Sequence, residues 1–359
     1  MNYKELIENT IMPGTLSANE QADRCVDLLK FVNSKIPHRL YRFRSCNERS
    51  LDSFYKDEIW FANGGEMNDD FDARIYYDRK KVKQWISSFA NIDDNINILD
   101  RIVSVDSIPI EIVRKYPWIK DAVNKIKTTS RDDIKQFLKQ VTGLIFDNFE
   151  NELQYISNVI QRGTKFACFS EKIYSDMMWG NYAANATGFA IEYEFGKENS
   201  LTFSTGINGQ NMIWCNLFPI LYGNERLDAT EYAIYMLKIY ILKKIMTANG
   251  FQYMNQLINE VIPCPDYFMV TKLAIKKSND WKPEKEWRLF LTSNNSDIAT
   301  ERFSKIVYKP SAVYLGRKIS NIHQKIIMDM AKEKAIPIYK MDINNNSKKY
   351  KLIRKAVKC

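Results

Sequence analysis

The sequence predicts an α+β protein whose mixed central sheet is built from separated segments of the chain, with large helical insertions between them. Three observations support this fold class. Apolar and polar residues alternate with the period of a strand within 38–62, 166–195 and 286–315, whereas 80–162 and 228–260 have helical spacing. Glycine and proline, 13 and 10 of 359 residues, are about half as frequent as usual, which leaves little room for linkers.

The first part of the chain predicts a helical extension followed by a strand, a helix and a strand. Residues 1–37 have an apolar stripe at helical spacing, which Pro37 ends, so we expect an N-terminal helical extension there. Period-two alternation predicts a strand at 40–44, a short helix follows at 48–55, and a compact apolar strand follows at 59–62. Helical spacing then predicts the first insertion, at 80–162.

Strand patterns return after this insertion. Strands are predicted at 166–170 and 188–195, separated by a short helix that Ser175 caps, and again at 218–222. Asp228 and Glu231 resemble a capping box, which opens the second insertion at 228–260. Further predicted elements complete a single α+β domain over 38–345; they are strands at 287–291, 304–307, 312–315 and 336–341 and a helix at 320–334. Residues 346–359 predict a solvated basic C-terminal tail, with a nucleic-acid patch as the alternative.

Composition narrows the class of protein. Two histidines, His38 and His323, exclude a multi-histidine metal centre, and we treat both as structural. Six cysteines without a C-x-x-C pair indicate neither a zinc site nor a disulfide framework, which fits a reducing cytoplasm. We expect no signal peptide, no membrane span and a cytoplasmic protein. The net charge of +9 permits a polyanionic partner.

Four short segments near predicted strand ends are rich in polar and aromatic residues. They are 41–45 (Tyr-Arg-Phe-Arg-Ser), 67–72 (Met-Asn-Asp-Asp-Phe-Asp), 168–171 with 178–183 (Cys-Phe-Ser-Glu and Met-Trp-Gly-Asn-Tyr-Ala) and 281–288 (Trp-Lys-Pro-Glu-Lys-Glu-Trp-Arg). In this order they resemble the bacterial domain of unknown function 2971, over about 38–310. The chain departs from that family twice. Asp70 replaces the usual proline, and Gly180-Asn181 replace a Ser-His, so no role of that histidine applies here.

The family supplies no activity, but the order of arginine, serine and Glu-x-Glu is similar to that of ADP-ribosyltransferases. This resemblance implies an enzyme that consumes NAD, by ADP-ribosyl transfer or by NAD glycohydrolysis. Breaking the bond between nicotinamide and ribose builds positive charge at the ribose carbon, which a carboxylate stabilises. In this interpretation Glu286 is the catalytic carboxylate, Glu284 orients or deprotonates the acceptor, and Ser170 positions the ribose.

The same interpretation assigns a set of binding residues. Arg42 or Arg44 would hold the pyrophosphate, because a guanidinium is a bidentate fork for phosphate. Trp179 and Tyr182 would place their rings against nicotinamide or adenine. Asn68 and Asp69 are further candidates for contacts with the cofactor. NAD would be the substrate and no metal is expected. The sequence leaves open whether the ADP-ribose goes to a protein, a nucleic acid or water.

Each assignment has a structural alternative. Glu284 and Glu286 are equally consistent with a surface salt-bridge ladder. Arg42 and Arg44 would then brace the fold by pairing with Asp69, Asp70 or Asp72, and Trp179 and Tyr182 would belong to the core. Asn68 and Asp69 would form only a turn.

Two other functions stay open. One is a non-catalytic nucleotide or nucleic-acid binding module that uses Arg42, Arg44 and the basic tail. The other is a nuclease in which Asp69, Asp72, Glu284 and Glu286 gather Mg²⁺, the ion that prefers oxygen ligands.

Overall fold

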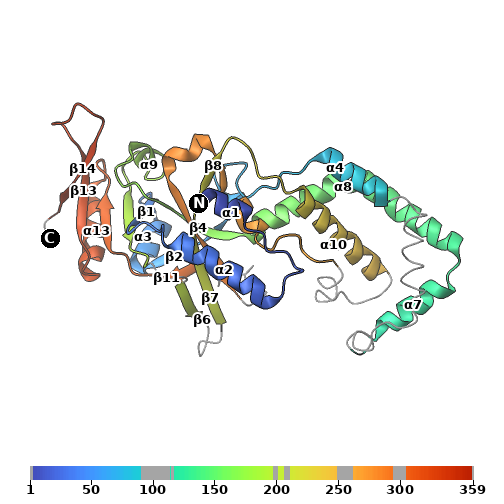
Figure 1. Ribbon diagram of the computed structural model, residues 1–359. Coiled ribbons are helices and arrows are strands. Elements are labelled where there is room, and N and C mark those ends of the chain that lie inside the picture. Colours follow the sequence, from blue (N-terminus) through green and yellow to red (C-terminus); the bar gives the residue numbers. More distant parts are fainter. Residues whose placement is uncertain are drawn as a thin grey trace. The chain divides into compact units, whose positions relative to one another are not determined.

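The computed structural model describes residues 3–89, 114, 117–196, 201–205, 211–248, 262–293 and 305–357. The chain divides into two compact units (Figure 1). Unit 1 comprises Met1–Ile75, Ser157–Leu227 and Asn259–Cys359, and unit 2 comprises Tyr76–Ile156 and Asp228–Ile258. The chain therefore leaves unit 1 twice, in stretches that overlap the helical insertions expected from the sequence.

Unit 1 is organised around a mixed sheet, which confirms the α+β fold class. The strand order is β14-β13-β12-β5-β1-β4-β10-β7-β6, with β3 also paired to β4. Within this sheet β12 and β13 are parallel and the other pairs are antiparallel. The strands are β1 (Leu40–Arg44), β3 (Ala62–Asn63), β4 (Lys165–Ser170), β5 (Phe189–Tyr193), β6 (Leu201–Thr205), β7 (Asn211–Pro219), β10 (Glu286–Ser293), β12 (Ala312–Leu315), β13 (Ile338–Ile343) and β14 (Leu352–Ala356).

Four strands lie outside this sheet, in two separate pairs. β2 (Glu58–Trp60) pairs with β11 (Lys305–Val307) in a separate two-stranded sheet, and β8 (Leu221–Gly223) pairs with β9 (Lys276–Ser278) in another. The expectation that 59–62 and 304–307 belong to the central sheet is therefore wrong for β2 and β11. The predicted strand at 59–62 is divided, and only Ala62 and Asn63 pair with β4.

The strands of unit 1 direct alternate side chains into two hydrophobic clusters, as the period of a strand requires. Leu40, Phe189 and Val313 belong to the larger cluster, whereas their neighbours along the strands, including Tyr41 and Tyr314, belong to the smaller one. α9 supplies Trp179 and Met178 to the smaller cluster, and other helices of unit 1 supply the larger one. The helices of unit 1 are α1 (Tyr3–Asn9), α2 (Ala18–Asn33), α3 (Glu48–Tyr55), α9 (Asp176–Asn181), α12 (Met269–Ala274) and α13 (Asn321–Glu333), with the 3-10 helices η1 (Gly64–Glu66) and η3 (Asn279–Glu284).

Both ends of the chain contribute to unit 1. Ile7 in α1 and Leu28 and Val32 in α2 are buried in the larger cluster, so the N-terminal helices are part of the core. The interpretation of 346–359 as a solvated tail is wrong, because this region contains β14, an edge strand of the main sheet. Arg354 lies over the Tyr339 ring, 4.4 Å from its centroid, and this stacking ties the strand to the sheet.

Unit 2 is helical in its described residues. α4 (Arg79–Phe89), α7 (Trp118–Thr128), the first part of α8 (Arg131–Gly163) and α10 (Thr230–Ala248) belong to it. The predicted capping residue Asp228 accepts hydrogen bonds from the backbone and the hydroxyl of Thr230, and α10 begins there. Tyr240 of α10 donates to Glu152 of α8 across 2.6 Å, which joins these two helices.

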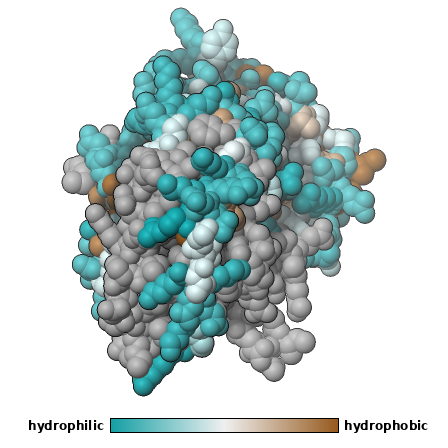
Figure 2. Space-filling model, turned by 90° about the vertical axis from the view of Figure 1, so that its right-hand side faces the viewer, coloured by the Kyte–Doolittle hydropathy of each residue, from teal (hydrophilic) through white to brown (hydrophobic). Residues whose placement is uncertain are grey.

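The surface drawn in Figure 2 is mainly hydrophilic where it is coloured, with only scattered hydrophobic side chains. None of the described helices combines the length and the apolar composition that crossing a bilayer requires.

Candidate functional site

A pocket of about 450 Å³ lies in unit 1 where two neighbouring strands separate. β1 and β4 pair at Tyr41 and Ser170, and the far end of β4 pairs with β3 instead. Consecutive residues of both strands, 41–45 and 166–170, therefore line the pocket, because strand edges rather than one face of the sheet border it. The carboxylates of Glu284 and Glu286 complete the lining on the β10 side.

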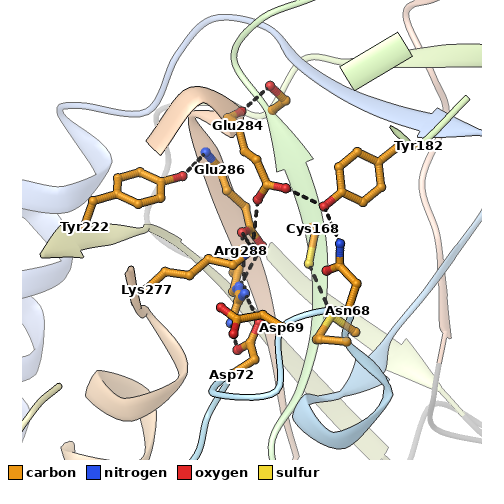
Figure 3. A network of polar contacts seen from close by, with 12 residues as sticks. Asn68, Asp69, Asp72, Cys168, Tyr182, Tyr222, Lys277, Glu284, Glu286 and Arg288 are labelled. Atoms are coloured by element: carbon orange, nitrogen blue, oxygen red, sulfur yellow. Dashed lines mark hydrogen bonds and ion pairs between the residues drawn. The ribbon is translucent and has the colours of Figure 1, made fainter. Parts of the chain in front are cut away.

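A buried network of ion pairs holds these two carboxylates (Figure 3). Lys277 Nζ lies 2.8 Å from Glu284 Oε2 and 3.0 Å from Glu286 Oε2. Arg288 Nε lies 2.7 Å from Glu286 Oε1, and both of its terminal nitrogens bind Asp72 at 2.6 and 2.5 Å. The network contains three carboxylates and two cations, so it carries an excess of one negative charge when all are ionised.

The chain approaches this network through an unusual backbone. Glu284 ends η3, Lys285 adopts the left-handed conformation with φ 48°, and Glu286 begins β10. Glu284 is therefore not a strand neighbour of Glu286, contrary to the expectation that both lie on the same strand face. The Ser170 hydroxyl fixes this corner, because it donates to the Glu284 carbonyl at 2.6 Å and accepts from the Lys172 amide at 3.1 Å. Ser170 thus positions the backbone of Glu284.

The two glutamates differ in ionisation because their neighbours differ. Burial raises the pKa of Glu284, and Lys277 and the Tyr182 hydroxyl only partly offset this. Burial would also raise the pKa of Glu286, but Arg288 and Lys277 outweigh it and lower this pKa to about 2. Glu286 is therefore ionised at neutral pH, and Glu284 is the carboxylate of the two that takes up a proton more readily.

Tyr182 extends the network toward the surface. Its hydroxyl donates to Glu284 Oε1 and accepts from the Asn68 side-chain amide at 2.9 Å. Burial and the acceptor Glu284 raise the pKa of Tyr182, so it remains a neutral donor. Tyr182 and Asn68 both line the pocket. The structure thus places Tyr182 at the site through its hydroxyl.

Three further arginines, besides Arg288, line the pocket. Arg42 and Arg44 come from β1, and Arg49 comes from the first turn of α3. Among the residues that the structure describes, none of the three forms an ion pair with a carboxylate. The suggestion that Arg42 and Arg44 brace the fold through Asp69, Asp70 or Asp72 is wrong, because Arg288 holds Asp72.

Two sequence-predicted residues lie away from the pocket. Trp179 is 1% exposed, its ring packs edge-on against Phe43, and its indole donates to the Ile173 carbonyl at 2.7 Å. It is a core residue and does not line the pocket. Asp69 accepts from the Phe71 amide at 2.9 Å and forms a turn, as the structural alternative for this residue predicted.

The polar network also contains residues that the sequence analysis did not assign; Lys277 and Arg288 line the pocket, whereas Tyr222 lies behind Glu286 in the network. Lys277, Arg288 and Tyr222 hold the glutamates, and the Tyr222 hydroxyl accepts from the Glu286 amide at 2.9 Å. Arg288 stands in the Glu-x-Glu-Trp-Arg motif, which is the signal that could have identified it. Lys277 and Tyr222 carry no comparable signal, because β8 and β9 become neighbours only in the folded protein.

Metal-binding geometry is not found among the described residues, where no three acidic, cysteine or histidine side chains are placed to hold one ion. Lys277 and Arg288 instead form ion pairs with three of the four acidic side chains that the nuclease hypothesis requires, namely Asp72, Glu284 and Glu286.

Comparisons with curated proteins and with solved structures give no match, so the resemblance to ADP-ribosyltransferases stays a prediction. The family comparison covers the region from α9 to β10. It includes Tyr182, Lys277, Glu284, Glu286 and Arg288 but neither Arg42 nor Ser170. Over residues 178–289 the chain matches the family described as a protein of unknown function (DUF2971), which confirms the resemblance found in its motifs.

Proposed function

We propose that unit 1 cleaves the bond between nicotinamide and ribose in NAD and transfers ADP-ribose to water or to a macromolecular acceptor. One observation carries this proposal. A carboxylate with a lowered pKa and a second carboxylate with a raised pKa line the same pocket as three guanidiniums that have no carboxylate partner among the described residues. Pairs of titratable groups with opposite pKa shifts are typical of acid–base sites.

Glu286 would stabilise the transition state. As the bond breaks, its electron pair leaves with nicotinamide and positive charge develops on the ribose. The excess negative charge of the buried network stabilises this positive charge. Arg288 and Lys277 hold Glu286 in place before the reaction begins. A preorganised charge of this kind acts more strongly on the transition state than on the substrate.

Glu284 would act on the acceptor. The acceptor oxygen attacks the ribose carbon, and its proton passes to the Glu284 carboxylate, whose raised pKa suits a general base. Ser170 and Tyr182 position Glu284 through its carbonyl and its carboxylate. Arg42 and Arg44 would hold the pyrophosphate. The five cysteines in the described part of the chain are free thiols, which supports the cytoplasmic setting that we propose.

A non-catalytic nucleotide-binding module is the second candidate. The observation that favours it is that Lys277 and Arg288 already satisfy both glutamates, as structural ion pairs do. Such a module would bind NAD without consuming it, so turnover separates the two functions.

The proposal is tested by measuring the release of nicotinamide from NAD, once with a chelator and once with Mg²⁺. The proteins compared are wild type, Glu286→Gln, Glu284→Gln and the exposed control Glu333→Gln. We expect release by wild type and by the control without added metal. Glu286→Gln should lose about a hundred- to a thousand-fold in rate, by analogy with the loss of one oxyanion-hole donor. Because Glu286→Gln also removes a buried ion-pair partner, rates are compared per folded molecule, below each variant's melting temperature.

No release by wild type, or equal release by wild type and both pocket variants, would refute cleavage of NAD. NAD binding without release would favour the binding module. Phosphodiester cleavage that disappears in chelator would favour the nuclease.

A further inference from the structure

Three of the four arginines that line the pocket have no described carboxylate partner, and they differ in exposure, which places Arg42 deepest and Arg49 nearest the mouth. Arg42 is 8% exposed, Arg44 is half-buried and Arg49 is exposed. Each pair is close enough for its charges to repel, since Arg44 and Arg49 both disfavour the charged form of Arg42. The pocket wall formed by β1 and the first turn of α3 therefore presents a continuous row of positive charge, which we call the arginine row.

The described contacts of the arginine row are to a backbone carbonyl and to aromatic rings, and none is to a carboxylate. Arg42 donates to the Trp60 carbonyl and lies 5.8 Å from the centroid of the Phe169 ring. Arg49 lies 5.4 Å from the centroid of the Trp60 ring. Two other lining carboxylates have partners elsewhere. Glu58 accepts from Lys305 at 2.6 Å and from the Trp60 indole at 3.0 Å, and Glu66 accepts from the Asn63 side-chain amide at 2.7 Å.

Such an arrangement is unfavourable without a ligand. Burial lowers the pKa of Arg42 to about 9, and repulsion by Arg44 adds to this. Burial and repulsion by Arg49 lower the pKa of Arg44 in the same way. A buried charge is ordinarily compensated by a partner of opposite sign, and among the described residues the arginine row has none.

We propose that Arg42, Arg44 and Arg49 form a subsite for a diphosphate group, with Arg49 as its specificity-determining residue at the mouth. This deepens the proposed function and rests on it for the remainder of the ligand. A diphosphate supplies several negative oxygens in a row, and guanidiniums bind such oxygens through paired, charge-assisted hydrogen bonds. A single phosphate reaches fewer of the three side chains, so the subsite selects two linked phosphates.

Binding of inorganic pyrophosphate to the full chain tests this subsite without requiring catalysis. Calorimetry at constant ionic strength compares wild type with Arg49→Gln and Arg42→Gln, and with Arg317→Gln, an exposed arginine outside the pocket, as the matched control. Wild type and the control should bind pyrophosphate more tightly than orthophosphate. Arg49→Gln should weaken pyrophosphate binding by roughly ten- to a hundred-fold, the range expected for losing a hydrogen bond between charged groups.

Thermal melting gives a second readout, in which the same substitution that weakens binding should raise the stability of the ligand-free protein. Arg42→Gln should abolish pyrophosphate binding and yet raise the melting temperature of the ligand-free protein, because it removes an uncompensated buried charge. A lower melting temperature with unchanged binding would show that Arg42 is a structural residue and would overturn the subsite. Equal binding by all four proteins, or no binding by wild type, would overturn it as well.

The outcomes also separate this subsite from the proposed function. Pyrophosphate binding without nicotinamide release keeps the subsite and refutes NAD cleavage. Nicotinamide release with a KM for NAD that Arg49→Gln leaves unchanged keeps the cleavage and refutes the subsite. An oligonucleotide that competes with pyrophosphate on wild type but not on Arg49→Gln would assign the arginine row to nucleic acid and overturn the small-ligand assignment.

Discussion

Glu284 and Glu286 differ in ionisation because Arg288 reaches only one of them. Lys277 contacts both carboxylates, whereas Arg288 binds Glu286 and places its other nitrogens on Asp72. Glu284 has the neutral donor Tyr182 in the corresponding place. The additional guanidinium neighbour of Glu286 thus accounts for the opposite pKa shifts of these two glutamates.

Tyr182→Phe should shift the acidic limb of the pH profile for nicotinamide release. The acidic limb reports protonation of the general base, and the raised pKa of Glu284 places it above the ordinary range of glutamate. Removing the phenol removes a hydrogen bond that favours the ionised carboxylate, so the limb should move to still higher pH. The measurement is kcat/KM against pH for wild type, Tyr182→Phe and the exposed control Tyr350→Phe.

The control should keep the wild-type profile. An acidic limb that stays in place in Tyr182→Phe, with only a uniform decrease in rate, would assign the general base to another group.

At the scale of elements, close backbone approaches hold β1 against its neighbours. A Cβ on Gly188, just before β5, would lie 2.1 Å from the Arg44 carbonyl oxygen. Gly316, just after β12, donates to the Gly188 carbonyl at 2.9 Å, and a Cβ there would lie 2.3 Å from the Ala186 carbonyl oxygen. Two glycines therefore allow β1, β5 and β12 to meet at the end of β1 that carries Arg44.

Gly188→Ala should destabilise unit 1 and weaken pyrophosphate binding, because the new methyl group must displace the backbone of Arg44. We expect a loss of about 1–3 kcal/mol, the range for overpacking a tight site. Gly180→Ala is the matched control: its Cβ would meet nothing within 4 Å, and alanine is favoured over glycine in a helix. Melting temperatures and pyrophosphate affinities of the two variants check this prediction.

A Gly188→Ala protein that melts and binds as Gly180→Ala does would show that the backbone relaxes without disturbing the arginine row.

At the scale of the whole molecule, the ion-pair network links folding to pH. The folded-state pKa of Glu286 is lowered, so its stabilising effect is present above its ordinary pKa and is lost as pH falls toward about 2. The pKa values of Glu284 and Asp72 are raised, so their effect has the opposite sign and disappears as pH rises through their folded-state values.

Glu286→Gln should therefore lower the melting temperature most at neutral pH and progressively less below pH 4.5, where Glu286 becomes protonated in the unfolded chain while it is still ionised in the folded protein. Removing one partner of a buried pair costs about 3–5 kcal/mol. The exposed control Glu333→Gln should show little difference at any pH. Melting curves of the three proteins between pH 7 and pH 3 check this, and a Glu286→Gln difference that does not depend on pH would contradict the assigned ionisation.

Much of the fold follows from local sequence. Period-two alternation correctly predicted β1, β4, β5, β10 and β12, and helical spacing predicted α3 and α13 close to their observed limits. Ser175 caps α9 as expected, because a serine hydroxyl satisfies a free amide at a helix start wherever that helix lies. The motifs also identified Arg42, Arg44, Tyr182, Glu284 and Glu286, which line one pocket.

What the sequence by itself determined is the set of elements and of polar residues at their ends, since backbone hydrogen bonding and side-chain periodicity act over a few residues. Only the tertiary structure decided the partners. Asp72 meets Arg288 across 216 positions of the chain, Arg42 and Arg44 receive no described carboxylate, and β14 joins the sheet instead of forming a tail. The reason is that local patterns do not encode which buried charges become neighbours, and these neighbours set the ionisation on which the site depends.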